Sequence, residues 1–174
     1  MNGSNRFPAG LPYPSLMSYA AILPEPLLKN PKDFFVYGVE FLPLAISAVK
    51  QTAIFQVQED SAFLIVAAAR LYLTNADAVI AGDQALALVN VIDSGSGRSL
   101  IAQTQPGGND SPIDNWFGTG KNPAYWPFPK ILRPNSVVTV QLTNLEATAR
   151  NYRLSFLGFK IFRSTAADSF AFAL

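Results

Sequence analysis

The sequence lacks two residue types that carry much of protein chemistry. Its 174 residues contain no cysteine and no histidine. The absence of cysteine excludes disulfides and thiolate nucleophiles. The absence of histidine excludes Ser–His–Asp triads, His-bearing zinc sites and histidine proton shuttles. Any general base would have to be a carboxylate or a lysine.

Charged residues are also scarce. They make up 14% of the chain, against 49% hydrophobic residues, whereas an average soluble domain carries about 25% charged residues. So little charge predicts that other molecules cover much of the surface. The formal net charge of +1 gives no reason to expect a nucleic-acid or membrane-surface partner.

Long apolar runs without breaks are missing too. The longest uncharged run, residues 7–24, contains four prolines. These breaks exclude a membrane-spanning helix and a signal-peptide core within the run. We therefore predict a soluble chain without a recognisable export signal.

The 13 prolines fall into two groups that divide the chain. Six lie within the first 31 residues, six lie between 106 and 134, and Pro43 stands alone. Because proline cannot donate to a strand ladder, both groups mark segments outside regular sheet. We expect one domain, which is usual for about 100–200 residues. The predicted parts are an extended N-terminal arm (1–32), a sandwich domain (33–163) with a long loop (105–132), and a C-terminal tail (164–174).

The remaining sequence reads as strands. Residues 138, 140 and 142 are apolar and alternate with polar residues, which is typical of a strand with one buried face. Residues 61–74, and the chain from Leu157 onward, are apolar on both faces, as in a strand buried on both sides. The predicted strands are 53–58, 61–74, 85–93, 98–104, 136–144 and 147–162. They predict an all-β fold, an antiparallel β-sandwich with jelly-roll topology, because two packed sheets close most strand edges.

Two polar motifs resemble catalytic sites only superficially. The stretch DSGSGRSL, 93–100, lacks both the spacing of a phosphate loop and the G-x-S-x-G of a nucleophile elbow. It predicts a plain hairpin turn. Glu59 and Asp60 are adjacent, so they point to opposite sides of an extended chain and cannot face each other across a glycosidic bond. We interpret them as solvated turn residues.

Oxygen ligands gather at residues 107–115. Asn109, Asp110, Asp114 and Asn115 have the chemistry that calcium prefers, although the spacing is not that of a dedicated calcium loop. Asx turns explain the same composition without a metal. We expect no cofactor, and a calcium ion near Asp110 and Asp114 stays an alternative that chelation would test.

Aromatic residues concentrate in the long loop, which holds both tryptophans of the chain. Loops of this length inside a compact domain are uncommon and tend to be functional. The rings could cap one end of the sandwich, stack on a sugar, or anchor a subunit interface, where such residues are enriched. The loop aromatics are Trp116, Phe117, Tyr125, Trp126 and Phe128.

The terminal segments favour the interface. The arm is too rich in proline for a helix and too apolar for a solvated tail, and the ending SFAFAL is equally apolar. The exterior of one small sandwich has too little groove to bury both apolar segments, so we expect neighbouring subunits to supply the remaining surface. We predict an assembly protein whose interface anchors are the five loop aromatics together with Phe7, Tyr13 and Leu16 of the arm.

The order of segments supports a more specific interpretation. FFVYGVEF is followed by FQVQEDSAFLIVAAA, VNVIDSGSGRSLIAQ, ILRPNSVVTVQLTN and YRLSFLGFKIF. This order resembles the small jelly-roll cement or decoration proteins of tailed bacteriophages, over residues 34–162 and without a catalytic signature.

The resemblance implies a non-enzymatic virion protein on the capsid surface. It implies a homotrimer that binds the major capsid protein and clamps adjacent capsomers through arms and loops. An alternative is a carbohydrate-binding jelly-roll module of a receptor-binding or fibre protein. An enzyme such as a carboxylate glycosidase is the third hypothesis, and no pair of carboxylates points to it.

Overall fold

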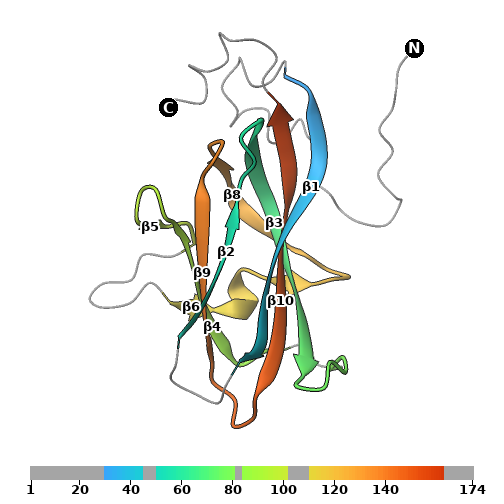
Figure 1. Ribbon diagram of the computed structural model, residues 1–174. Helices are drawn as coiled ribbons and strands as arrows, with labels where there is room; N and C mark the ends of the chain where they lie inside the picture. The colour runs from blue at the N-terminus through green and yellow to red at the C-terminus, as the bar shows by residue number, and fades with distance from the viewer. Residues whose placement is uncertain (1–29, 45–49, 81–83, 102–109, 163–174) are drawn as a thin grey trace.

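The computed structural model describes residues 30–44, 50–80, 84–101 and 110–162, and it shows two β-sheets packed face to face (Figure 1). One sheet, here called sheet A, contains β1 (Lys32–Leu44), β10 (Arg150–Phe162), β3 (Ser61–Thr74), β7 (Gly118–Thr119) and β8 (Ala124–Leu132). Sheet B contains β2 (Gln51–Gln56), β9 (Val137–Asn144), β4 (Ala87–Asp93), β5 (Arg98–Ser99) and β6 (Ser111–Pro112). The 3₁₀ helix η1 (Ile113–Asn115) connects β6 to β7.

The strand pairing is nested along the chain. The first strand pairs with the last (β1 with β10), β2 pairs with β9, β3 with β8, and β4 with β5 and β6. Successive long strands alternate between the sheets, so the chain runs as one long hairpin wrapped around a common core. This is the jelly-roll arrangement. The predicted all-β sandwich is therefore confirmed.

The core lies between the sheets and follows the alternation seen in the sequence. Val138, Val140 and Leu142 of β9 are fully buried, while the residues between them are partly exposed. Sheet A contributes Tyr152, Leu154 and Phe156 from β10, also fully buried. Such interleaved burial of both inner faces is what holds a β-sandwich together.

Strand β3 is buried on both faces, as predicted. Phe63 and Ile65 face the core between the sheets, while Ala62 and Leu64 lie on the opposite side of sheet A. That opposite side carries a second apolar cluster, which we call the outer cluster. It consists of Ala62, Leu64, Val66, Ala67, Phe159 and Ile161.

The predicted long loop is wrong in its last third, where the structure has strand β8 (Figure 1). Proline did not prevent a strand because the ladder with β3 is interrupted. Tyr125 pairs with Ala67, the register then shifts, and pairing resumes at Lys130 opposite Ile65. Residues 126–129, with both prolines, fall in this irregularity, where no backbone donor is required.

The turns behave as the sequence indicates. Residues 94–97 close a hairpin between β4 and β5, and Gly97 takes the positive φ of 67° that glycine tolerates best. Beyond β5, residues 102–104 of the predicted strand lie outside the described residues. Glu59 and Asp60 are exposed in the turn before β3.

Among the described residues no helix has the length and apolar character needed to cross a membrane.

Candidate interaction surface

The two tryptophans of the 110–132 region pack into the molecule. Trp126 is 3% exposed, and its indole Nε1 donates to the Trp116 carbonyl at 3.1 Å. The Trp116 indole donates in turn to Ser111 Oγ at 3.0 Å, and the two rings meet edge to face with centroids 6.0 Å apart. Both indole donors are thus satisfied within the chain, as buried tryptophans require.

The interface role predicted for Phe117 and Trp126 is therefore corrected. Both rings contact Phe156 of β10 edge to face, at centroid distances of 5.4 and 6.2 Å. Phe117 is fully buried, and Trp116 is partly buried against the same core. The segment folds back over one end of the sandwich, so these rings offer no open platform to a sugar or a partner chain.

The other two aromatics of the segment lie elsewhere. Tyr125 is partly buried against the outer cluster. Phe128, in the interruption of the β8 ladder, is 76% exposed. Of the five loop anchors predicted, Phe128 is the side chain that the fold leaves open to a partner. The arm anchors Phe7, Tyr13 and Leu16 lie outside the described residues.

The outward side of sheet A is apolar at its β1 edge. Phe34 and Val36 are 51% and 42% exposed, and we call this pair the outer strip. They lie opposite Phe159 and Leu157 in the β1–β10 register, and the Phe34 and Phe159 rings make an edge contact at 5.9 Å. The strip is thus continuous with the outer cluster. Farther along the same strands, Glu40 and Arg153 form an exposed ion pair at 3.0 Å.

The outward side of sheet B mixes polar and apolar side chains. Thr139 and Gln141 of β9 point outward, with Thr52 and Asn90 beside Gln141 on the neighbouring strands. Thr139 lies between two isoleucines, Ile54 of β2, which is 65% exposed, and Ile92 of β4, which is partly buried. Both outward sides of the sandwich therefore carry apolar side chains.

The carboxylates considered for calcium have cationic partners instead. Lys50 Nζ lies 2.9 Å from Asp110. Arg70 binds Asp114 through both Nε and Nη2, at 2.7 and 2.6 Å, and the Ala85 amide donates to the same carboxylate. Asp110 binds Lys50, which precedes β2, whereas Asp114 binds Arg70 of β3, so the two carboxylates do not share one site. No group of three potential ligands that could hold a metal occurs in the part of the chain that the structure describes.

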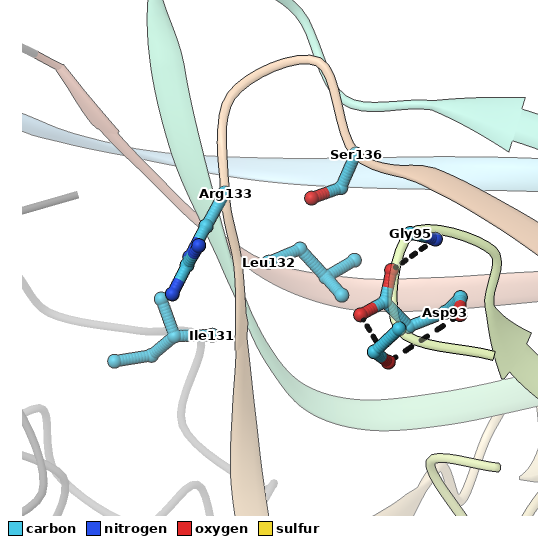
Figure 2. Close-up of a pocket in the computed structure, with 7 residues that line it drawn as sticks. Asp93, Gly95, Ile131, Leu132, Arg133 and Ser136 are labelled. Carbon is cyan, nitrogen blue, oxygen red and sulfur yellow. Dashed lines mark hydrogen bonds between the residues drawn. The ribbon is translucent and has the colours of Figure 1, made fainter. Parts of the chain in front are cut away.

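A polar pocket of about 420 Å³ opens at one end of the sandwich. In Figure 2, Asp93 and Gly95 lie on one side, Arg133 and Ile131 on the other, and Leu132 and Ser136 between them. The Asp93 carboxylate accepts hydrogen bonds from the Gly95 amide and the Ser96 hydroxyl, at 3.2 and 2.7 Å. The carboxylate is engaged in building the turn, which confirms the hairpin interpretation of residues 93–100.

The buried lysine in the described region is also explained by packing. Lys160 is 5% exposed. Its ammonium donates to the Gln58 side-chain oxygen and lies 3.7 Å from the centroid of the Phe35 ring. A cation over an aromatic face is stabilised by the ring quadrupole. This lysine joins β10 to β1 and to the β2–β3 turn.

No protein-family model matches the chain, and no curated protein matches its sequence. The likeness to phage cement proteins therefore stays a prediction from segment order and composition.

Sequence reasoning missed Phe34 and Val36 as surface residues. The signal was present, because both faces of residues 61–74 and of the chain after Leu157 are apolar. A strand with two apolar faces in a two-layered fold must present one of them outward. The outward apolar face of β3 and β10 is the outer cluster, and the exposed strip lies beside it on the edge strand β1.

Proposed function

We propose that this chain is a non-enzymatic structural protein of a virion, a cement or decoration protein that sits on the capsid surface as a homotrimer and binds the major capsid protein. The proposal joins the resemblance in segment order to a jelly-roll sandwich with adjoining exposed apolar residues on the outward side of sheet A. It assigns the outer strip and Phe128 to contacts with neighbouring subunits, and the apolar arm to attachment.

The observation that carries the proposal is the pair of adjoining exposed apolar residues on the outward side of sheet A. Protein surfaces expose scattered apolar residues as a rule, whereas adjoining exposed apolar residues mark contact sites. Phe34 and Val36 adjoin each other and the outer cluster. Aromatic side chains in such positions are enriched at the centres of interfaces.

The packing of the carboxylates and lysine is consistent with a structural role. Asp93, Asp114 and Lys160 each hold neighbouring strands or turns together. A general acid or base needs room to reach the proton it transfers. These groups instead stabilise the sandwich on which the contact surface is built.

The first experiment measures the assembly state of the full chain by light scattering. The wild type is expected to be a trimer. The double variant Phe34→Ser/Val36→Thr is expected to dissociate, since each exposed apolar residue at an interface contributes on the order of 1 kcal/mol or more when buried. Ile54→Ser, at a position on sheet B that is even more exposed (65%), is the control and should remain trimeric. A monomeric wild type at micromolar concentration would refute the trimer.

The second experiment measures binding to particles assembled from the major capsid protein of the same virus. The wild type and Ile54→Ser should co-sediment with particles, and the strip variant should bind more weakly. Equal binding by all three would show that the apolar face of sheet A is not the contact surface.

A further inference from the structure

We propose that the polar pocket between the β4–β5 turn and the β8–β9 turn binds a neutral sugar. In this site the hydroxyls of a mono- or disaccharide contact Asp93 on one side and Arg133 on the other. The inference goes beyond the proposed function, because attachment to a capsid requires no small molecule. Its test uses the protein without particles, so its failure is distinct from a failure of the virion proposal.

The first step is the size and shape of the pocket. Its volume of about 420 Å³ falls within the range of about 300–1,000 Å³ that is usual for small-ligand sites. The two turns that form its sides come from separate parts of the chain, and Leu132 and Ser136 lie between Asp93 and Arg133 (Figure 2). The space is therefore large enough for one or two sugar rings.

The second step is that backbone hydrogen bonds fix both sides of the pocket. The Ser94 amide donates to the Val137 carbonyl at 2.9 Å, which joins the β4–β5 turn to the start of β9. The Ser136 amide donates to the Arg133 carbonyl at 3.0 Å, and the Val57 amide donates to the Ser136 carbonyl at 2.9 Å. Because these turns are formed before a ligand arrives, binding requires little further ordering of the chain.

The third step is the remaining hydrogen-bonding capacity of Asp93. One carboxylate oxygen accepts from the Gly95 amide at 3.2 Å, and the other accepts from the Ser96 hydroxyl at 2.7 Å. A carboxylate oxygen has two lone pairs, so each oxygen can accept one more hydrogen bond. Asp93 can thus receive two hydroxyl groups of a ligand while it continues to hold the turn.

The fourth step is the availability of Arg133. Its side chain is exposed, and no hydrogen bond or ion pair with the described part of the chain engages its guanidinium. A guanidinium carries five donors in one plane, which suits the oxygens of neighbouring hydroxyls. Donors on this side and acceptors on the other match a ligand whose groups both donate and accept.

The charges and hydroxyls of the pocket indicate which ligand class it takes. A free anion would meet the carboxylate of Asp93, and a free cation would meet the guanidinium of Arg133, so the pair disfavours ions of either sign. The hydroxyls of Ser96 and Ser136 offer further partners to a ligand with several hydroxyls. Ile131 and Leu132 add apolar surface, as ligand pockets usually do beside their polar groups. A neutral sugar uses all of these features.

Amide NMR of the ¹⁵N-labelled full chain tests the proposal. The probes are glucose, galactose, mannose, N-acetylglucosamine and lactose. Each is added to about 50 mM, because one open pocket is expected to bind a single sugar with an affinity on the order of 1 mM. At least one sugar should shift the amide signals of Gly95, Ser96 and Ser136 in a saturable manner.

Two variants and a control locate the binding. Arg133→Ala should weaken it about tenfold, since hydrogen bonds to charged groups are the stronger ones. Asp93→Asn keeps an oxygen for the Gly95 amide but removes the charge and one acceptor oxygen, and it should have a similar effect. Arg98→Ala removes an exposed arginine of β5 that does not line the pocket, and it should leave the affinity unchanged. A thermal melt checks the fold of Asp93→Asn, and Arg133→Ala decides the matter if that variant is unfolded.

Other results would overturn the inference. Saturable shifts with glycine but with no sugar would show that the pocket takes a zwitterion, and shifts with inorganic phosphate alone would show an anion site at Arg133. Sugar binding that Arg133→Ala leaves unchanged would lie elsewhere on the molecule. The absence of shifts with every sugar probe would show that the pocket is not a sugar site.

Discussion

The hydroxyl of Tyr152 lies in the core without a hydrogen-bond partner. Its side chain is fully buried, whereas the nearby Tyr72 hydroxyl accepts a hydrogen bond from Arg150 Nε at 3.1 Å. A buried polar group without a partner retains its desolvation cost. Tyr152→Phe should therefore keep the free energy of unfolding or raise it by up to about 1 kcal/mol, while Tyr72→Phe should lower it by about 1 kcal/mol. Urea denaturation checks both, and a clear loss in Tyr152→Phe would reveal a partner such as a bound water.

The same hydroxyl gives the fold a dependence on alkaline pH. Desolvation by burial raises the pKa of Tyr152, and the Glu146 carboxylate raises it further. Below about pH 10 the hydroxyl is protonated in both the folded and the unfolded chain, so it adds no pH dependence. Above that pH the unfolded chain releases the proton first, so stability falls as pH rises. Tyr152→Phe should make this fall shallower in denaturation measured between pH 9 and 11; an identical slope would contradict the assignment.

At the residue scale, the sequence predicts burial well in strands and poorly in the aromatic segment. The alternation of β9 identifies Val138 and Val140 as core residues without further information. The burial of Trp126 depends on the Trp116 carbonyl, ten residues earlier, and on the Phe156 ring of β10, and these groups meet only in the folded sandwich. No local pattern distinguishes such a ring from the exposed Phe128 two positions later.

At the scale of elements, η1 is fastened to β3 by one ion pair. Arg70 has a side chain only 4% exposed, and it holds Asp114 through two nitrogens. Asp114→Asn would remove the carboxylate that Arg70 binds, and should lower the free energy of unfolding by about 1–3 kcal/mol. Glu40→Gln removes the exposed partner of Arg153 and should cost at most about 1 kcal/mol. Comparable losses in the two variants, measured by chemical denaturation, would show that burial of the Arg70 pair is unimportant.

The pairing of β10 with β3 depends on a glycine at a register shift. The ladder shifts between Leu157 and Gly158, and a Cβ on Gly158 would overlap the Leu64 carbonyl. Gly158→Ala must therefore displace backbone, and we expect a largely unfolded or aggregated protein by circular dichroism. Gly38→Ala is the control, because its Cβ would meet the Leu154 carbonyl at an ordinary 3.8 Å. A cooperative native-like melt of Gly158→Ala would show that the shift can relax.

Elements were predictable where their side chains follow a simple pattern. Strand β9 and the first part of β10 follow from residue alternation, and β3 follows from its continuous apolar run. Strand β8 did not, because its prolines are tolerated only through the irregular pairing with β3, which cannot be read locally. The jelly-roll order was predicted because two packed sheets leave few strand edges unpaired, and the observed nested pairing of the strands agrees with that prediction.

At the scale of the molecule, exposed apolar residues lie on both sheets. Sheet A exposes Phe34 and Val36 beside the buried outer cluster, and sheet B exposes Ile54. The Glu40–Arg153 ion pair lies on the outward side of sheet A, on the same two strands as the strip. The strip variant and Ile54→Ser therefore compare what each sheet contributes to association.

Truncation can test the role of the N-terminal arm. Deletion of residues 1–29 keeps β1, which begins at Lys32, and keeps Pro31, whose carbonyl accepts from Phe162. The free energy of unfolding should therefore change little, while attachment to capsid particles should be lost. Thermal melts and particle co-sedimentation of the truncated chain decide the matter: full occupancy of particles without the arm would remove its role in attachment, because the sandwich alone would then supply the contact.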